Sequence, residues 1–461
     1  MSTQNIIFDL ELIKRYDKSG PRYTSYPTAV QFHEGFGQAE YRELAQQTNA
    51  SGRPLSLYFH IPFCDTVCYY CGCNKVVTKD RSRAAPYLER LHRELAMQAE
   101  LFDASRTVDQ LHWGGGTPTF ISHEEMRELM RVTGEYFNLR NDDSGEYSIE
   151  IDPREVKTDT IALLRELGFN RMSLGVQDFD PRVQKAVNRI QSEASTMAAL
   201  SAARQEGFKS ISIDLIYGLP FQSVDSFAAT LDKILAISPD RLSVFNYAHL
   251  PELFKPQRRI NEADLPAPQE KLDILQQTIE TLTANGYVYI GMDHFAKPDD
   301  ELAVAQRSGT LYRNFQGYST HADCDLIGLG ATSIGQVGDS YSQNRKELEE
   351  YYASIDAGHL PVYRGYHLNA DDKLRRAVIT DLICHFELNK AKVEQAYGIV
   401  FDDYFATELN DLAGMQGDGL VQLSAERIIV QDAGKLLIRN ICMVFDRYLR
   451  EKQNQRFSKV I

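Results

Sequence analysis

The chain has 461 residues, of which 43% are hydrophobic and 25% charged, and this composition is typical of a globular protein. Its formal net charge of −14 disfavours a nucleic-acid binder, and it means that an anionic ligand must meet a local group of cations. The N-terminal residues lack a signal-peptide pattern and no stretch is apolar over the length of a membrane span, so we expect a cytoplasmic protein that binds neither membranes nor nucleic acids.

An N-terminal arm and lead-in are predicted over residues 1–50. The segment Gly20–Thr28, with the sequence GPRYTSYPT, combines two prolines, one glycine and two tyrosines. Because proline and glycine interrupt helices, this composition predicts an extended arm.

Six repeats of a short strand followed by a longer helix are predicted within residues 51–365, which we expect to hold a barrel and its extension. Serial strand–helix units indicate parallel strands joined by right-handed crossovers. The predicted strands are Leu55–Pro62, Gln110–Trp113, Ser148–Asp152, Arg171–Gln177, Ser210–Tyr217 and Arg241–His249. The predicted helices are Ala84–Phe102, Ser122–Phe137, Asp159–Leu167, Glu193–Glu206, Val224–Ile237 and Pro268–Asn285.

Polar or glycine-rich residues lie at the end of nearly every predicted strand. A group of cysteines follows the first strand, GGGTPT follows the second, and Glu150 and Asp152 end the third. A barrel collects its active site from the ends of many strands, whereas a doubly wound sheet concentrates it at one switch point. We therefore predict an α/β fold with a partial TIM-like (β/α)6 barrel.

A separate C-terminal domain is predicted over residues 366–461. Its pattern indicates helices at Asp371–Phe386, Lys390–Tyr397 and Asp402–Leu412, then a short hairpin and a last helix from Ala433. Three helices and a hairpin resemble a winged-helix module. Since its charge is nearly balanced, a lid or structural role is favoured over DNA binding.

Four of the seven cysteines, Cys64, Cys68, Cys71 and Cys73, fall within ten residues. A structural zinc site usually uses two ligand pairs separated by a longer loop, and a thioredoxin-like motif would leave two of the four unexplained. Disulfides are rare in the cytoplasm. Close-spaced thiols on a glycine-containing loop therefore favour an iron–sulfur cluster over zinc or disulfide chemistry.

The sequence resembles a known family. The spacing C-x3-C-x2-C after the first barrel strand is the signature of radical S-adenosylmethionine (SAM) enzymes. The segments HIPFC, CGCNK, LHWGGGTPT, SIEIDPRE, GFNRMSLGVQDF, DLIYGLP, SVFNYAHLP, GMDHFA and NFQGY, with the arm, are similar to the oxygen-independent coproporphyrinogen III oxidases of haem biosynthesis. The similar segments cover about residues 20–320.

The resemblance implies an oxidoreductase that converts two propionates of coproporphyrinogen III to vinyl groups and so gives protoporphyrinogen IX. It implies a [4Fe–4S] cluster held by Cys64, Cys68 and Cys71, with one iron left open for SAM. Cleavage of SAM then yields a 5′-deoxyadenosyl radical. Cys73 lies too close to Cys71 to be an easy fourth ligand, and a fourth ligand would close the reactive iron, so its role stays open.

Two SAM molecules are implied by the same resemblance. The first would contact Tyr58, Tyr70, Gly115, Glu150 and Ile334, and the second Gly116, Thr117, Gln177, Arg189, Asp214 and Ala248. On pattern alone, Ile334 would be a core residue, Arg189 a solvated helix residue, and Glu150 an outward-facing strand carboxylate.

The substrate carries four carboxylates, so cations are expected at its site. Arg22 is the best candidate, with Lys297, Arg307 and Arg313 weaker, while Tyr23 and Tyr26 would either pack on the tetrapyrrole or fasten the arm. We expect a monomer served by an unidentified electron donor and an electron acceptor.

Two alternatives to this function share the barrel: a haem chaperone of the same family, and a radical SAM methylase that acts on tetrapyrroles. Cys73 and the arm favour the oxidase. The isolated cysteines Cys324, Cys384 and Cys442 are expected to be core thiols.

Overall fold

The computed structural model describes residues 6–451, which form two compact units. The first, called the sheet unit, comprises Phe32–Ile274 and Asp323–His367. The second, called the helical unit, comprises Leu275–Ala322 and the described residues of Met1–Gln31 and Leu368–Ile461. Because each unit groups segments that are distant in the sequence, the boundaries expected at residues 50 and 365 stay a prediction.

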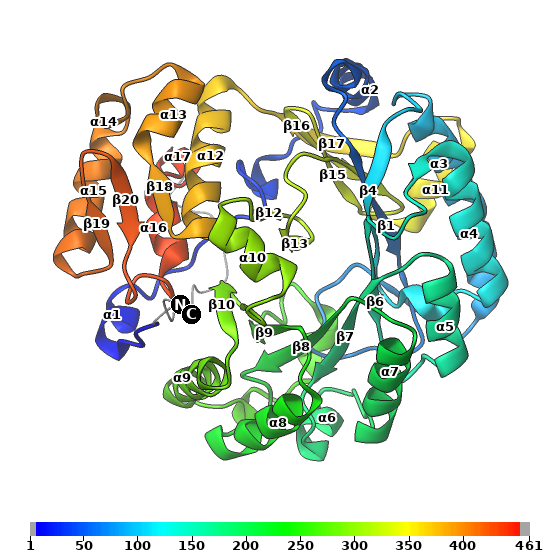
Figure 1. Ribbon diagram of the computed structural model, residues 1–461. Helices are drawn as coiled ribbons and strands as arrows, with labels where there is room; N and C mark the ends of the chain where they lie inside the picture. The colour runs from blue at the N-terminus through cyan, green and yellow to red at the C-terminus, as the bar shows by residue number, and fades with distance from the viewer. Residues whose placement is uncertain (1–5, 452–461) are drawn as a thin grey trace. The chain divides into compact units, whose positions relative to one another are not determined.

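A parallel sheet is the framework of the sheet unit (Figure 1). Its strands lie in the order β9-β8-β7-β6-β4-β1, and each neighbouring pair is parallel. Their bounds are β1 Leu55–Ile61, β4 Thr107–Gly115, β6 Glu146–Ile151, β7 Arg171–Gln177, β8 Ser210–Tyr217 and β9 Arg241–Asn246. Each overlaps one of the six predicted strands, so the predicted parallel succession is confirmed.

Helices connect these strands and lie along the outside of the sheet (Figure 1). Helix α4 begins after Ser122, whose hydroxyl accepts from the Glu125 amide over 3.2 Å while Glu125 accepts from the Ser122 amide over 2.7 Å. The apolar side chains Met126, Leu129 and Met130 are buried at helical spacing. The helices are α3 Ala84–Ala99, α4 His123–Tyr136, α5 Thr158–Glu166, α6 Pro181–Ala186, α7 Glu193–Gln205 and α8 Val224–Ile237, and only the short α6 had no prediction. The predicted sixth helix is α9 Pro268–Ala284, which crosses the boundary between the two units.

Strands from later in the chain extend the sheet beyond β1. Strand β14 (Asp325–Leu329) pairs in parallel with β1, and β15 (Ile334–Val337), β16 (Ser340–Asn344) and β17 (Val362–His367) follow in antiparallel order. In the described residues β1 and β9 do not pair with each other, so the barrel is incomplete, as predicted. The unit also contains β2 Phe63–Cys64, β3 Val76–Val77, β5 Asn138–Leu139, α2 Gln38–Gln47 and α11 Leu348–Asp356.

The C-terminal part of the chain is mostly helical, as predicted. A three-stranded antiparallel sheet in the order β18-β20-β19 accompanies the helices, and the last predicted helix begins at Ile438 and not at Ala433. The elements are α12 Ala370–His385, β18 Glu387–Asn389, α13 Lys390–Tyr397, α14 Phe401–Tyr404, α15 Ala406–Gly417, β19 Val421–Leu423, β20 Arg427–Val430, α16 Ile438–Val444 and α17 Arg447–Glu451. The helical unit also holds α1 Leu10–Arg15, β10 Val288–Gly291, β11 His294–Ala296, α10 Glu301–Ser308, β12 Tyr312–Asn314 and β13 Gly317–Ser319.

The segment Gly20–Thr28 contains no helix or strand, as expected for an extended arm. Its two tyrosines are buried in the helical unit, with Tyr23 4% and Tyr26 1% exposed. The Tyr23 hydroxyl donates to Asp446 over 3.0 Å, and the Tyr26 hydroxyl accepts from the Arg447 amide over 3.1 Å. The tyrosines therefore fasten the arm to the last helices.

Residues 6–451 include no helix that is both long enough and apolar enough to cross a lipid bilayer.

Candidate functional site

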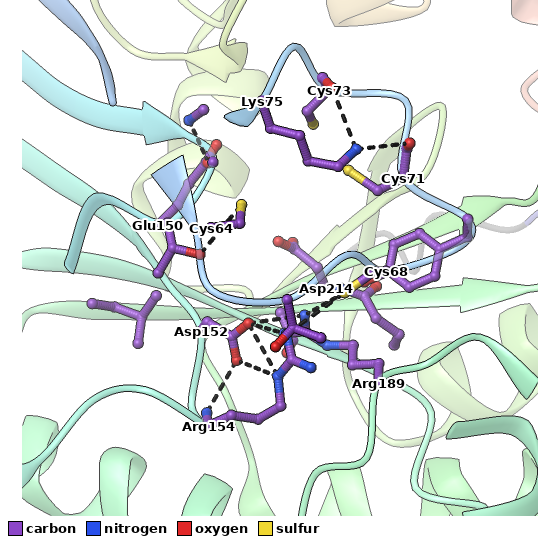
Figure 2. A pocket seen from close by; sticks show the side chains of 18 of the residues that line it. Cys64, Cys68, Cys71, Cys73, Lys75, Glu150, Asp152, Arg154, Arg189 and Asp214 are labelled. Atoms are coloured by element: carbon purple, nitrogen blue, oxygen red, sulfur yellow. Dashed lines mark hydrogen bonds and ion pairs between the residues drawn. The ribbon is translucent and has the colours of Figure 1, made fainter. Parts of the chain in front are cut away.

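A pocket of about 240 Å³ in the sheet unit is lined by the cysteine loop and by residues of strands β4, β6, β7 and β8 (Figure 2). The predicted site residues that line it are Cys64, Cys68, Cys71, Tyr70, Gly115, Gly116, Thr117, Glu150, Gln177, Arg189 and Asp214. Further lining residues that had no assigned role are Thr66, Cys73, Lys75, Ile151, Asp152, Arg154, Ser173 and Gly175. Residues from distant parts of the sequence thus converge where the parallel strands end.

The cysteine loop is held at both ends by backbone pairing. Phe63 and Cys64 pair in parallel with Val76 and Val77, the Val76 amide donates to the Pro62 carbonyl over 2.7 Å, and the loop between the two short strands carries the other three thiols. The Tyr69 amide also donates to the Val187 carbonyl over 2.9 Å. This anchoring brings the clustered thiols to one pocket. All seven cysteines are free, and Cys324, Cys384 and Cys442 are buried as expected.

The clustered thiols have different surroundings. Burial raises the pKa of Cys64 to about 12, although the Thr117 hydroxyl, 3.7 Å from its sulfur, opposes this rise. The pKa of Cys71 is lowered by a hydrogen bond from Cys73 and by the charge of Lys75, whose Nζ donates to the Cys71 carbonyl over 3.1 Å. The pKa of Cys73 is raised by the same hydrogen bond. A thiolate is therefore favoured at Cys71 over Cys73.

The glycine turn after β4 packs directly against the backbone next to Cys64. The Gly116 amide donates to the Ile61 carbonyl over 2.8 Å, and the Thr117 amide donates to the Phe63 carbonyl over 2.7 Å. A Cβ atom on Gly116 would lie 2.6 Å from the Phe63 carbonyl oxygen, and Gly115 has a φ of +113°. Close backbone approach and a positive φ thus both require glycine here.

Glu150 on β6 presents a carboxylate to this turn. Its Oε2 accepts from the Gly115 amide over 3.0 Å, and His112 Nε2 lies 3.5 Å from Oε1. The surrounding protein would by itself raise the pKa of Glu150, but His112 and the Gly115 amide lower it. Because the side chain lines the pocket with 47% of its surface exposed, Glu150 offers a charged hydrogen-bond acceptor to a ligand.

Arg189 and Arg154 share the carboxylate of Asp152 beside Cys68 (Figure 2). Arg189 Nη1 donates to Asp152 over 3.1 Å and to the Cys68 sulfur over 3.5 Å. Arg154 Nη2 donates to Asp152 over 2.6 Å and lies 3.6 Å from the same sulfur. Arg189 is only 6% exposed, so it is not the solvated helix residue that the sequence pattern alone would suggest. Asp152 thus holds two guanidinium groups beside the Cys68 sulfur.

Asp214 on β8 lies at another part of the pocket. Its Oδ2 accepts from the Ser173 hydroxyl over 2.9 Å, and burial raises the pKa of Asp214 to about 6. A Cβ on Gly175 would lie 2.9 Å from Gln177 Nε2 and 3.0 Å from Arg189 Nη2. Because Gly175 has no side chain, Gln177 and Arg189 have room beside it at the wall of the pocket.

Tyr58, Ala248 and Ile334 do not line this pocket. The Tyr58 hydroxyl is 3.2 Å from His60 Nδ1, and the Ala248 carbonyl accepts from Gln257 Nε2 over 3.2 Å. Gln257 also donates to the backbone of the cysteine loop, and Ile334 begins β15. Their contacts with SAM stay predictions.

The predicted substrate residues belong to the helical unit. Arg22 forms an ion pair with Asp293, while Tyr23 and Tyr26 make the contacts that fasten the arm. Those contacts account for the burial of the tyrosines. Participation of the three residues in substrate binding stays a prediction.

The side chains of the pocket fit an iron–sulfur cluster and a zwitterionic nucleoside. Thiolates are the usual ligands of such clusters, and several thiols reach this one pocket. Arg189 Nε is buried without a hydrogen-bond partner in the described residues and is available to an acceptor. Glu150 and Asp214 supply carboxylates, which are groups suited to accept hydrogen bonds from hydroxyls.

A partial parallel barrel with the spacing C-x3-C-x2-C at its strand ends defines a radical SAM enzyme. Residues 58–234 match the family model of the radical SAM superfamily, which agrees with this class. Residues 368–437 match the model of the HemN C-terminal domain.

Full-length relatives narrow the class to one family. The chain is 58% identical to an oxygen-independent coproporphyrinogen III oxidase of Pseudomonas aeruginosa over 99% of both chains. It is 54% identical to a protein of the same name from Escherichia coli over 100% of both chains. The solved structure of coproporphyrinogen III oxidase (HemN) from Escherichia coli, a radical SAM enzyme, superimposes with a TM-score of 0.92 at 52% identity and covers 97% of this chain and 100% of its own. The chain belongs to the family of oxygen-independent coproporphyrinogen III oxidases.

Proposed function

We propose that the pocket is the site at which this chain carries out the reaction for which its family is named. The chain is a radical SAM oxidoreductase of porphyrin biosynthesis that oxidatively decarboxylates two propionates of coproporphyrinogen III to vinyl groups without oxygen. The observation that carries this proposal is the meeting of the cysteine loop, the glycine turn and the carboxylates of β6 and β8 in one pocket.

Cys64, Cys68 and Cys71 would hold a [4Fe–4S] cluster through their thiolates. The bound cluster and SAM supply one-electron reductive cleavage of a sulfonium and abstraction of a hydrogen atom from the substrate. Arg154 and Arg189 place positive charge beside Cys68, and Lys75 places it beside Cys71. These cations offset the negative charge that thiolates bring into a partly buried site.

The first SAM would meet Tyr58, Tyr70, Gly115, Glu150 and Ile334. The Glu150 carboxylate is charged and open to the pocket, which suits it to accept ribose hydroxyls. The Gly115 amide orients this carboxylate through its 3.0 Å hydrogen bond. Absence of a side chain at Gly115 leaves room for a ligand next to the turn.

A second SAM would bind at Gly116, Thr117, Gln177, Arg189, Asp214 and Ala248. The unpartnered Nε of Arg189 suits a carboxylate, and Asp214 suits hydroxyl groups. Arg189 already donates to Asp152, so it would hold the ligand and the protein carboxylate together. Sharing of this kind fixes the guanidinium in one orientation.

We also propose that the enzyme works in the cytoplasm as a monomer and uses a separate electron donor and an electron acceptor. The seven free cysteines support a reducing compartment. A donor would be needed to supply one electron for each SAM cleaved. The acceptor is needed because loss of a hydrogen atom and CO2 leaves one electron on the substrate.

The test is anaerobic reconstitution with iron and sulfide, followed by incubation with SAM, a reductant, an electron acceptor and coproporphyrinogen III. We expect methionine, CO2 and protoporphyrinogen IX, which chromatography of the oxidised porphyrins detects. A preparation that cleaves SAM and binds haem tightly, yet leaves coproporphyrinogen III unchanged, would support a haem chaperone and contradict the proposal.

A further inference from the structure

Arg313 in the helical unit is a buried guanidinium with unsatisfied donors. It lies on strand β12, is 7% exposed, and its Nε and Nη1 atoms are buried without a hydrogen-bond partner in the part of the chain that the structure describes. Arginine carries five N–H donors and stays charged at all ordinary pH values. Buried charged donors without acceptors are costly, so such a group in a folded protein needs an explanation.

The neighbours of Arg313 do not neutralise it. Its guanidinium carbon lies 4.7 Å from the centre of the Tyr318 ring, a contact with a π face and not with an anion. Burial raises the pKa of Tyr318, Cys384 and Cys442, so all three side chains are neutral near pH 7. Arg313 thus acts on three neutral side chains, and the carboxylate whose charge also reaches Tyr318, Asp293, is already paired with Arg22.

Two further arginines of the same unit complete a group that we call the guanidinium cluster: Arg22, Arg313 and Arg439. Arg439 is 4% exposed, and it donates through Nε to the Pro21 carbonyl over 3.1 Å and through Nη2 to the Gly20 carbonyl. Arg22 is paired with the carboxylate of Asp293. The cluster thus joins strand β12, helix α16 and the arm.

Arg439 lies within the electrostatic influence of the other two cations. Burial, together with the charges of Arg22 and Arg313, lowers the pKa of Arg439 to about 10, while Asp293 opposes the shift. Like charges held together in a poorly solvated place repel each other, and an anion relieves that repulsion. Binding of an anionic ligand would therefore stabilise the guanidinium cluster.

We infer that the guanidinium cluster is a carboxylate-binding site and that its ligand is a propionate of the tetrapyrrole substrate. A guanidinium has two forked edges, Nε with Nη2 and Nη1 with Nη2, and each edge matches the two oxygens of a carboxylate. Arg313 has an unpartnered donor on each edge, Nε on one and Nη1 on the other. The substrate carries four carboxylates, and the chain's net charge of −14 would repel it from most of the surface. The substrate assignment rests on the proposed function, whereas the carboxylate chemistry rests on the cluster itself.

The test measures equilibrium binding of coproporphyrin III, the oxidised and fluorescent form of the substrate, to the reconstituted holoenzyme. Arg313→Gln is compared with Arg427→Gln, a control at an exposed arginine of β20 in the same unit. We expect Arg313→Gln to raise the Kd for coproporphyrin III by about tenfold or more, as loss of a hydrogen-bonded charge pair does. Arg427→Gln should leave the Kd unchanged.

A second ligand separates carboxylate recognition from loss of packing. Coproporphyrin III tetramethyl ester keeps the ring and lacks the charges, so wild type and Arg313→Gln should bind it equally. Arg313→Lys keeps one charge without the fork and should bind the acid with intermediate affinity. If Arg313→Gln loses acid and ester alike, the arginine serves packing and the inference is wrong.

Stability gives a readout that does not depend on turnover. Without ligand, Arg313→Gln should have a Tm equal to or above that of the wild type, because an unsatisfied buried charge is removed. Coproporphyrin III should raise the Tm of the wild type more than that of the variant. A lower ligand-free Tm with an unchanged Kd would assign Arg313 to structure and overturn the inference.

Two outcomes distinguish the carboxylate site from the substrate assignment and from the proposed function. If acetate or citrate raises the Tm of the wild type only, while acid and ester bind equally, the site takes carboxylates but the substrate assignment is overturned. If the wild type binds coproporphyrin III through Arg313 yet converts no coproporphyrinogen III, the site stands and the proposed function fails.

Discussion

Replacing Glu94 by glutamine is predicted to weaken the dependence of folding stability on pH. Glu94 lies on helix α3 and is 0% exposed. Its carboxylate accepts from the Gly330 amide over 2.8 Å, from the Tyr351 hydroxyl over 2.7 Å and from Asn344 Nδ2 over 2.7 Å. Burial raises the pKa of Glu94 to about 7 although these hydrogen bonds oppose the rise. The network ties α3 to the turn that follows β14.

The magnitude follows from the difference between the folded and unfolded pKa values. The pKa rises from an ordinary 4.5 to about 7, which corresponds to roughly 3 kcal/mol at 1.36 kcal/mol per unit. Because the folded pKa is the higher one, protonation favours the folded state. The contribution is fully present below the unfolded pKa and is lost as the pH rises through about 7. Between about pH 5 and about pH 8, the unfolding free energy of the wild type should fall roughly 2 to 3 kcal/mol more than that of Glu94→Gln.

The assay is urea unfolding at a series of pH values, followed by the fluorescence of the single tryptophan, Trp113. Other buried carboxyls also titrate in this range, but they contribute equally to both proteins, so the difference isolates Glu94. Glu89→Gln, at an exposed position of the same helix, is the control and should show the wild-type dependence. A difference between wild type and Glu94→Gln that stays constant with pH, or that favours the wild type as pH rises, would refute the reasoning.

The remaining predictions concern the pocket. Cys68→Ser should lose bound iron and sulfide after reconstitution, whereas Cys73→Ser should keep them, and a fully loaded cluster in Cys68→Ser would disprove its assignment as a ligand. Gly116→Ala places a Cβ 2.6 Å from the Phe63 carbonyl oxygen. We therefore expect a lower Tm, a free energy of unfolding lower by about 1–3 kcal/mol, and weaker binding of SAM. Gly414→Ala, inside a helix with nothing within 4 Å, should raise the Tm, and equal effects at the two glycines would contradict this account. Asp152→Asn leaves two arginines without their shared carboxylate and should lower the free energy of unfolding by about 3–5 kcal/mol in urea titration, while an unchanged value would show that the charges do not interact.

The parallel strands could be predicted because their signals are local. Each strand is a short β-branched or alternating run next to an amphipathic helix, and β7 and β8 have the predicted bounds. The antiparallel extension gave no such signal. Strand β16, with the sequence SYSQN, is polar and yet buried throughout, because pairing with β15 and β17 satisfies its backbone. When the burial of a strand depends on pairing with distant strands, the sequence of that strand alone does not predict it.

The residues of the site also differ in whether the sequence could predict them. The spacing of the cysteines is local, and the glycine turn and Glu150 mark strand ends, so these residues could be found from the sequence. The ion-paired group of Asp152, Arg154 and Arg189 could not, since it depends on how three segments pack beside Cys68. Arg313 was only a weak candidate because nothing in the sequence shows that its guanidinium is buried without acceptors.

The most direct test of the proposed function follows the hydrogen atom that leaves the substrate. Coproporphyrinogen III deuterated at the β-carbons of the propionates is incubated anaerobically with the reconstituted enzyme, SAM, reductant and electron acceptor, and the 5′-deoxyadenosine is analysed by mass spectrometry. The account predicts one deuterium in the 5′-deoxyadenosine, together with deuterated protoporphyrinogen IX, and neither product from Cys68→Ser. Formation of protoporphyrinogen IX with no deuterium in 5′-deoxyadenosine, or by the Cys68→Ser protein, would contradict it.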